Sequence, residues 1–206
     1  MKLFISIFTL KKIPTLSWSS FDALNLKPKS TTLIYLILGL ILFGLGETIL
    51  IAASVGVSPW TVLAQGMSVK TGYSIGLTTF VVSISVLCLW IPLKQKPGIG
   101  TILNAIIISI VLDVSLPYLP TPESFFLQIL QVTIGVLIVG LGSGFYLIAN
   151  LGPGPRDGLM TGVQKVTGKP IALVRSTIEI IVVFFGWLLG GTVGLGTKYN
   201  DYFYCR

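Results

Sequence analysis

Residues 151–168, LGPGPRDGLMTGVQKVTG, resemble residues 55–72, VGVSPWTVLAQGMSVKTG, which lie 96 positions earlier in the chain. Each stretch has a glycine near its start, a proline three residues later, a second glycine in its middle and a closing Thr-Gly. At this spacing the surrounding sequence aligns without a gap, with about 20 identities over roughly 70 positions. The chain is therefore predicted to be a duplicated unit.

The composition is that of a membrane protein. Of the 206 residues, 53% are hydrophobic and 10% are charged, and the mean hydropathy is +0.91. This leaves too little polar surface to cover a water-soluble globule. A net charge of +7 would suggest nucleic-acid binding in a soluble chain, but here the basic residues cluster in short hydrophilic segments. We interpret this clustering as a topology signal and expect no nucleic acid as a partner.

Residue types that support several kinds of chemistry are scarce in the chain. There is no histidine, and the two cysteines, Cys88 and Cys205, form no CxxC pair. This excludes a histidine-based catalytic centre and gives no support to a disulfide framework or a metal site. No nucleophile has an evident base, and no two acids stand at a motif spacing. We therefore predict no enzymatic activity, no metal and no cofactor.

Five apolar segments approach the ~20 residues that a helix needs to cross a bilayer. They are residues 32–53, 75–93, 99–119, 125–147 and 171–189. Residues 59–70 and 155–166 are too short and too polar to cross. We predict that these two are short helices that dip into the membrane or lie at its surface, with Ser58 as the N-cap before Pro59. The predicted fold class is an all-α, polytopic transmembrane helical bundle.

The distribution of basic residues predicts the topology. When the N-terminal arm with its five lysines is placed in the cytosol, every loop that falls inside contains Lys or Arg. The loops that fall outside contain one lysine or none, as the positive-inside rule requires. With three crossings per unit, an odd number, the second unit is predicted to be inverted relative to the first. Inverted repeats are typical of many transporters, whose sites lie at the repeat interface near short or broken helices.

This organisation divides the chain into four parts. Residues 1–30 form a basic cytosolic arm, 31–120 a first membrane repeat with three spans, 121–197 a second repeat with two spans, and 198–206 a divergent tail. The second repeat lacks the third crossing that the first repeat predicts. A truncated or frameshifted end, or a partner that supplies a sixth span, would explain this difference. A homo-oligomer is one such arrangement.

Three short motifs carry a resemblance to a known family. They are Gly56-Val-Ser-Pro59-Trp60, Gly152-Pro-Gly154-Pro155-Arg156-Asp157-Gly158 and Gly98-Ile-Gly100-Thr101. With the hydropathy pattern, these motifs make residues 32–197 similar to the YczE/YyaS/YitT family of bacterial membrane proteins. The resemblance implies a multi-pass protein of the bacterial inner membrane that is thought to be transporter-like and whose substrates are largely undefined.

Ionisable side chains within spans are destabilising, so each one is a functional hypothesis. Glu47 lies about two-thirds of the way across the first span, where it would bind a cation, carry a proton or serve as a hydrogen-bonded structural residue. Arg175 and Glu179 are spaced so that they share one face of the fifth span. They would form either an ion pair near the cytosolic end or a substrate contact.

Arg156 and Asp157 begin the second short helix. An anion held between Arg156 and the backbone amides of Gly158 and Leu159 would satisfy both the cation and the helix dipole. An anionic ligand is therefore one hypothesis, and a positive residue beside a cytosolic turn is the alternative. Trp60, at the matching position outside, is predicted to be an interfacial anchor.

The other polar and small residues of the spans are predicted to support packing between helices. The side chains expected to form interhelical hydrogen bonds, or as the alternative to line a pathway, are Asn104, Asp113, Gln128 and Gln131. Gly140 and Gly144 form a GxxxG pair that would allow close helix contact. Further glycines with the same expected role are Gly39, Gly44, Gly46 and Gly135.

Together these features predict a small-molecule transporter or exporter in the lipid bilayer. Its site would form where the two short helices approach each other at the repeat interface. Glu47 would be the coupling carboxylate, and the cytosolic entrance would be lined by Arg156, Arg175 and Glu179. The alternative is a non-transporting accessory membrane protein that assembles with a partner, in which the polar residues are mostly structural.

Overall fold

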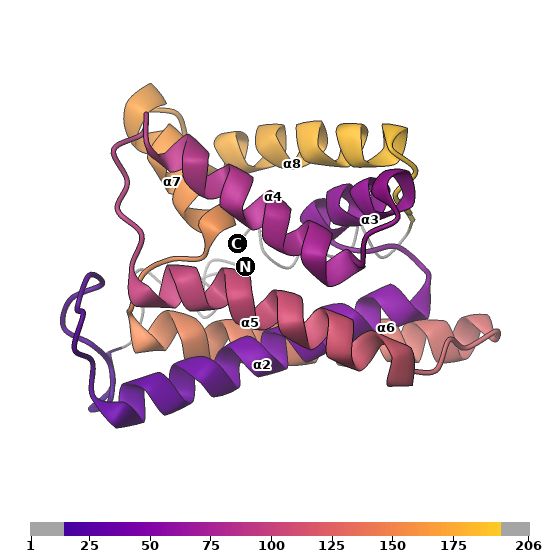
Figure 1. Cartoon of the computed structure of the whole chain (residues 1–206), viewed down its shortest axis with the longest axis horizontal. Coiled ribbons are helices and arrows are strands. Elements are labelled where there is room, and N and C mark those ends of the chain that lie inside the picture. Colours follow the sequence, from indigo (N-terminus) through magenta and orange to yellow (C-terminus); the bar gives the residue numbers. More distant parts are fainter. Residues whose placement is uncertain (1–14, 195–206) are drawn as a thin grey trace, which may run out of the picture.

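The computed structural model describes residues 15–194, which form α-helices joined by short connections (Figure 1). The longer helices are α2 (Ser30–Ala53), α5 (Ile99–Ser115), α6 (Phe125–Ala149) and α8 (Ile171–Leu188). The others are α3 (Pro59–Thr71), α4 (Ile75–Trp90), α7 (Pro155–Thr167) and the 3-10 turn η1 (Leu116–Tyr118). The predicted all-α class is confirmed for this range. The first part of the basic arm and the divergent tail lie outside the described residues.

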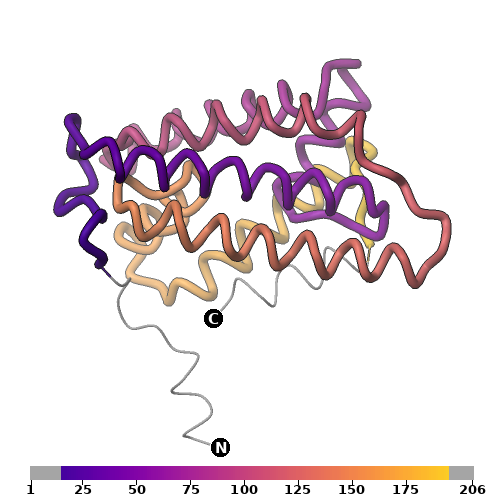
Figure 2. Tube along the Cα trace, turned by 90° about the horizontal axis from the view of Figure 1, so that it is seen from below, coloured from indigo at the N-terminus to yellow at the C-terminus, as the bar shows by residue number. Residues whose placement is uncertain are grey.

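The helices are arranged in two layers (Figure 1). One layer contains α2, α5 and α6, and the other contains α3, α4, α7 and α8. Within the layers α2 packs against α5 and α6, and α3 packs against α8. The layers are joined because α4 contacts α5 as well as α7. Figure 2 shows from below that the axes of α2, α5 and α6 lie nearly parallel to one another, with the chain direction of α6 opposite to that of α2.

Four helical segments are long and apolar enough to cross a membrane. They are α2, α5 together with η1, α6 and α8. A fifth span exists only if α3 and α4, which are bent by 117° at a short break, are counted as one. The predicted separate span 75–93 is thus shorter than expected, since α4 has 16 residues and covers about 24 Å. It ends at Trp90, two residues before Pro92, which cannot donate a helical hydrogen bond.

The two short helices form as predicted, each one residue longer at its C-terminal end. Both have proline at the first helical position and end at a left-handed glycine, with φ of 73° at Gly72 and 66° at Gly168. Ser58 occupies the N-cap position of α3, but its hydroxyl makes no capping bond. The hydroxyl is directed instead at Glu47 of α2. The capping role of its side chain was therefore predicted wrongly, although its position was right.

Unusual backbone conformations recur at the spacing of the sequence repeat. Every described residue with positive φ has a partner with positive φ 96 positions away, and the pairs are Ser54 and Asn150, Gly56 and Gly152, Gly72 and Gly168, and Lys94 and Gly190. The first pair forms the left-handed C-caps of α2 and α6. Positive φ is unfavourable for residues other than glycine. Its recurrence at matched places shows that the two stretches share their local structure.

The longest helices, α2 and α6, cross at glycines. A Cβ on Gly46 would lie 2.6 Å from the Val139 side chain and 2.9 Å from the Gly135 carbonyl oxygen. A Cβ on Gly142 would lie 2.6 Å from the Gly39 carbonyl oxygen. The predicted close approach is therefore confirmed for Gly39, Gly46 and Gly135, because larger residues would separate the two backbones.

The predicted GxxxG contact does not occur among the described residues. A Cβ on Gly140 or Gly144 would have no atom within 4 Å. The helix contact follows Gly135 and Gly142 instead, which are seven residues apart and so lie on one face of α6. Gly140 and Gly144 are rotated away from that face. The sequence identified the right helix but the wrong side of it.

Two of the four polar residues expected to join helices do so. Asp113 of α5 accepts a hydrogen bond of 2.7 Å from the amide of Gly76 at the start of α4. Gln131 of α6 donates to a backbone carbonyl of α2 over 3.3 Å. Gln128 donates to the carbonyl of Pro122, six residues earlier, so the only bond shown for it within the described range is local. Its predicted interhelical role is wrong.

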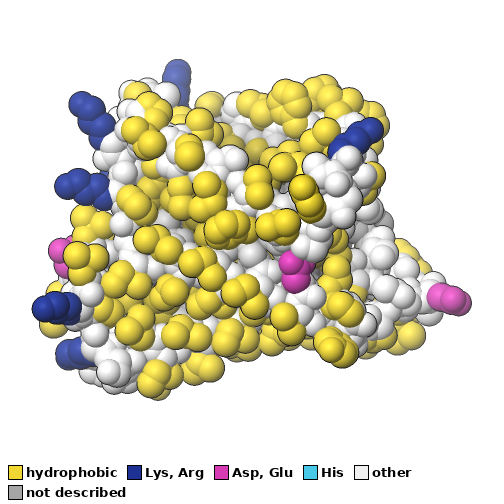
Figure 3. Space-filling view, viewed as in Figure 1, with side chains coloured by type: hydrophobic (Ala, Val, Ile, Leu, Met, Phe, Trp, Pro, Cys, Tyr) yellow, Lys and Arg dark blue, Asp and Glu magenta, His cyan; other side chains and the backbone are white. Residues whose placement is uncertain are grey.

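The surface has the pattern expected of a membrane protein. Figure 3 shows apolar side chains over the middle of the molecule and Lys and Arg side chains mainly at one end. That end includes the start of α2, the α4–α5 connection and the α7–α8 turn (Figure 1). The basic residues of these segments are Lys27, Lys29, Lys94, Lys96, Lys165 and Lys169. Large apolar side chains such as Leu137 and Ile180 are 65% and 69% exposed, as lipid-facing residues are.

Candidate functional site

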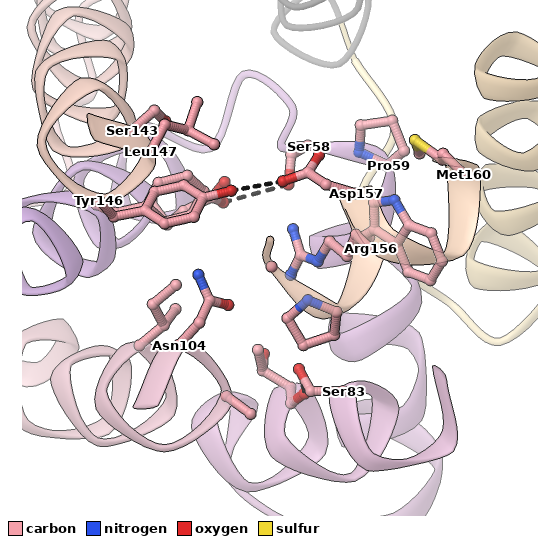
Figure 4. A pocket seen from close by; sticks show the side chains of 18 of the residues that line it. Ser58, Pro59, Ser83, Asn104, Ser143, Tyr146, Leu147, Arg156, Asp157 and Met160 are labelled. Carbon is pink, nitrogen blue, oxygen red and sulfur yellow. Dashed lines mark hydrogen bonds between the residues drawn. The ribbon is translucent and has the colours of Figure 1, made fainter. Parts of the chain in front are cut away.

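A cavity of about 400 Å³ lies between the two layers, next to the N-terminal ends of α3 and α7 (Figure 4). Its wall includes residues of α2 to α8. This volume is within the range of small-molecule pockets. The five charged candidates from the sequence all line it: Glu47, Arg156, Asp157, Arg175 and Glu179. Residues that are up to 132 positions apart are thus brought together, on three different helices.

Glu47 is held by two hydroxyl groups. Its side chain is on α2 and only 3% of the residue is exposed. The Oε2 atom accepts a hydrogen bond of 2.8 Å from Thr61 and one of 3.2 Å from Ser58. Ser58 is the N-cap of α3 and Thr61 is in its first turn, where a negative charge also interacts favourably with the helix dipole. The carboxylate therefore ties α2 to the start of α3.

Asp157 is held in a related way by Tyr146. The Tyr146 hydroxyl of α6 donates to Asp157 Oδ2 over 2.6 Å, as the dashed line in Figure 4 shows. Such a short O–H to carboxylate bond is stronger than one between neutral groups. Asp157 is 96 positions from Thr61, so the short helix of the second stretch has a carboxylate where that of the first has a hydroxyl. In both, a carboxylate–hydroxyl bond ties a long helix to the short helix after it.

Arg175 and Glu179 form the predicted ion pair. The Arg175 Nε atom lies 2.9 Å from Glu179 Oε1, one helical turn along α8. The side chains are 23% and 8% exposed. Both line the cavity, so the pair places opposite charges next to each other in its wall. Desolvated charges require such pairing because burial of a single ion is strongly unfavourable.

Trp60 and Arg156 join the starts of the two short helices. The guanidinium carbon of Arg156 lies 5.7 Å from the centroid of the Trp60 ring, a cation–π distance. Trp60 is only 6% exposed. Its predicted role as an interfacial anchor is therefore wrong, because the ring is covered by protein and faces the cavity.

The predicted anion cradle at the start of α7 is not present as expected. The amide of Gly158, one of its two proposed donors, bonds the Gly154 carbonyl over 3.0 Å. The Asp157 carboxylate already supplies negative charge in the first turn of α7. Of the groups proposed to hold an anion there, Arg156 remains in the cavity wall.

The motif glycines allow loops to approach each other closely. A Cβ on Gly56 would lie 2.8 Å from the backbone nitrogen of Gly194, and a Cβ on Gly152 would lie 3.0 Å from the Cα of Gly98. Gly56 and Gly152 are also left-handed. The amide of Gly100 then donates to the backbone oxygen of Leu151 over 2.8 Å. These contacts fix the loops that lead into α3 and α7.

The other motif residues position the start of α7. The carbonyl of Pro155 accepts a hydrogen bond of 2.9 Å from the indole nitrogen of Trp90. Gly158 lies directly against the same ring, because a Cβ there would overlap it. Gly154 and both prolines, Pro59 and Pro155, line the cavity itself.

Sequence reasoning missed the neutral polar residues of the site. Asn104 was expected first to join helices, but it lines the cavity, in line with the alternative of a pathway residue, and makes no side-chain hydrogen bond with any described residue. Thr61 had a signal, since it stands where the second copy has Asp157. Tyr146 had none, because the first copy has Leu50 at that place.

Comparison with known proteins supports the resemblance. The model of a family of unknown function, DUF6198, matches residues 30–198. An uncharacterized protein of Haemophilus influenzae is 39% identical over 188 residues, which cover 91% of this chain and 85% of the relative. No solved structure matches this chain.

Two relatives come from Bacillus subtilis. The uncharacterized membrane protein YczE is 30% identical over 161 residues, 77% of this chain and 75% of YczE. The uncharacterized protein YyaS is 25% identical over 164 residues, 78% of this chain and 82% of YyaS. The chain therefore belongs to the DUF6198 family and is a membrane protein similar to YczE and YyaS, as its glycine and proline motifs predicted.

Proposed function

We propose that the protein is a small-molecule transporter of the bacterial inner membrane and that the cavity is its substrate site. The observation that carries this proposal is the position of the cavity, between the starts of two short helices that match each other in the sequence repeat. Transporters with repeats commonly bind their substrates at such a place. Charged residues buried in membrane proteins also mark substrate or ion pathways.

The helix contacts support an inverted arrangement of the two units. Gly39 meets Gly142 and Gly46 meets Gly135, so α2 and α6 run in opposite directions with matched residues exchanged. In the same way α3 packs against α8, and α7 against α4. A two-fold axis perpendicular to α2 and α6 would relate these contacts. If α2 and α6 span the membrane, that axis lies in the membrane plane and the units are inverted.

Cysteine labelling tests the inversion. Val69 of α3 and Lys165 of α7 are exposed and 96 positions apart, so a single cysteine at each reports matched positions. In a Cys88→Ser, Cys205→Ser background, we expect an impermeant maleimide to label Val69→Cys from outside intact cells. Lys165→Cys should be labelled only in inverted vesicles, since its basic loop is cytosolic. Labelling of both from the same side would contradict the inversion.

Access to the cavity tests transport without knowledge of the substrate. Ser143 lines the cavity at the position that matches Glu47. A transporter exposes its central site alternately to the two sides, so Ser143→Cys should react with impermeant maleimide in both intact cells and inverted vesicles. Ser85→Cys is the matched control, because Ser85 is exposed on α4 and does not line the cavity. Reaction of Ser143→Cys from one side only would count against transport.

A second candidate function is that of an accessory protein that receives a helix from a partner. Gly44 of α2 packs against Val111 of α5, whereas the matching Gly140 of α6 has no described atom within 4 Å of a Cβ position. A helix similar to α5 from a partner protein would fit there. Purification with one stoichiometric partner, together with no reaction of Ser143→Cys from either side, would favour this function over transport.

A further inference from the structure

The charges of the cavity do not balance within the described residues. Arg175 and Glu179 neutralise each other. Glu47 and Asp157 are bonded by hydroxyl groups, and neither makes an ion pair with a described residue. Arg156 contributes the remaining positive charge, so the three acids and two bases of the wall sum to −1. A carboxylate in a low-dielectric site is stabilised by a cation, so this wall favours a positively charged ligand.

Gly154 leaves space next to one of these carboxylates. A Cβ on Gly154 would lie 3.4 Å from Asp157 Oδ2, 3.4 Å from the Tyr146 hydroxyl and 3.5 Å from the Asn104 amide nitrogen. Three polar groups thus border the space in front of Gly154. The carboxamide of Asn104 can donate or accept hydrogen bonds and makes none with a described residue. It is therefore suited to contact a ligand at this position.

The first unit indicates which chemical group belongs there. Ser58 is the residue that matches Gly154, and its hydroxyl donates to the Glu47 carboxylate over 3.2 Å. A hydrogen-bond donor thus lies next to a carboxylate at the start of α3. At the start of α7 the carboxylate is Asp157, but Gly154 has no side chain that could donate to it. Asp157 already accepts a hydrogen bond from Tyr146, and a ligand with a donor group would supply the second donor that Ser58 supplies in the first unit.

We propose that the cavity binds a small primary amine in its ammonium form, with the ammonium at Gly154 against Asp157, Tyr146 and Asn104. An ammonium has three donor hydrogens: two can bond the Asp157 carboxylate and the Tyr146 oxygen, and the third requires Asn104 to turn its carboxamide oxygen, in place of Nδ2, toward Gly154. Arg156 and the N-terminus of α7 oppose a cation here, whereas Asp157 attracts it and the wall as a whole sums to −1. The identity of the amine as a transported substrate rests on the proposed function, whereas its binding does not.

Three probes with the same four-carbon chain separate the effect of charge from that of size. The melting temperature of the purified full chain in detergent is measured with n-butylammonium chloride, sodium butyrate and n-butanol, each against sodium chloride at equal ionic strength. A ligand that binds the folded state raises the melting temperature in a saturable way. We expect this rise with butylammonium alone. A rise with butyrate, an equal rise with butanol, or no rise with butylammonium would overturn the inference.

Variants locate the ammonium. Gly154→Ser places a hydroxyl in the niche as Ser58 does, and its Cβ would be at ordinary contact distances with a permitted φ of −59°. We expect it to keep the melting temperature and to lose the response to butylammonium. Asp157→Asn should weaken binding by at least about 10-fold. The matched control is Glu123→Gln, which changes an exposed carboxylate outside the cavity and should bind normally. Normal binding by Gly154→Ser and Asp157→Asn would contradict the assignment.

Failure of this inference can be told apart from failure of the transport proposal. Butylammonium binding together with reaction of Ser143→Cys from one side only would leave the ligand class standing and remove transport. Reaction from both sides with no butylammonium binding would leave transport standing and remove the amine. The two measurements are independent because the labelling requires no ligand.

Discussion

Replacement of Gly142 by valine should lower the free energy of unfolding by about 3 kcal/mol. A Cβ at this position would lie 2.5 Å from the backbone nitrogen of Phe43 and 2.6 Å from the carbonyl oxygen of Gly39. Both atoms belong to the backbone of α2, so the clash cannot be relieved by rotation of a side chain. The two helices would have to separate along the contact that holds the first layer together. Unfolding in mixed detergent micelles, followed by tryptophan fluorescence, measures the change.

Gly140→Val is the matched control on the same helix. It makes the same substitution two residues away, where a Cβ has no atom within 4 Å. We expect a change of about 0.5 kcal/mol or less, since valine has a higher helix propensity than glycine and meets no described neighbour. Equal destabilisation by both variants would mean that α6 does not contact α2 through the Gly135–Gly142 face.

The contrast between Gly142 and Gly140 also shows which features of the fold can be predicted from one sequence. The number, type and approximate bounds of the helices follow from local properties, namely apolar length, proline at helix starts and glycine at helix ends. The rotation of a helix about its own axis does not follow from these local properties, because it depends on which side chains the neighbouring helices place against it. GxxxG at Gly140 was therefore as plausible as the Gly135–Gly142 spacing that forms the contact.

The same distinction applies to the candidate site. Glu47, Arg175 and Glu179 were identified because a charge in an apolar span is rare and destabilising, which makes it visible in the sequence. Arg156 and Asp157 were identified because they begin a short helix, where charges interact with the helix dipole. Their hydroxyl partners are common residue types, and nothing local distinguishes Tyr146 or Thr61 from other polar residues. Trp60 was misplaced for a related reason, since tryptophan occurs both at membrane interfaces and in protein cores. The sequence could thus predict the charges of the site but not the neutral groups that position them.

The contact between Trp90 and Gly158 predicts strong coupling between two substitutions. Gly158→Val alone should destabilise the protein by about 3 kcal/mol, because the new side chain overlaps the buried indole. Trp90→Ala alone should cost about 3–5 kcal/mol through the cavity it leaves and the lost bond to Pro155. In the double variant the valine occupies part of that cavity. We expect the double variant to be destabilised by about 1–3 kcal/mol less than the sum of the two single variants.

The first unit supplies the physical basis for this expectation. There Val62 of α3 matches Gly158, and Gly186 of α8 matches Trp90. A Cβ on Gly186 would lie 2.7 Å from the carbonyl carbon of Val62, so the larger residue of that pair is on the short helix. In the second unit the larger residue is on the long helix, which means that either partner can fill the space between them.

Trp90→Ala combined with Gly142→Val, which share no contact, should instead be additive within about 0.5 kcal/mol. Additivity of the Trp90 and Gly158 variants would contradict the direct packing of α4 against the start of α7, on which the positions of Arg156 and Asp157 in the cavity depend.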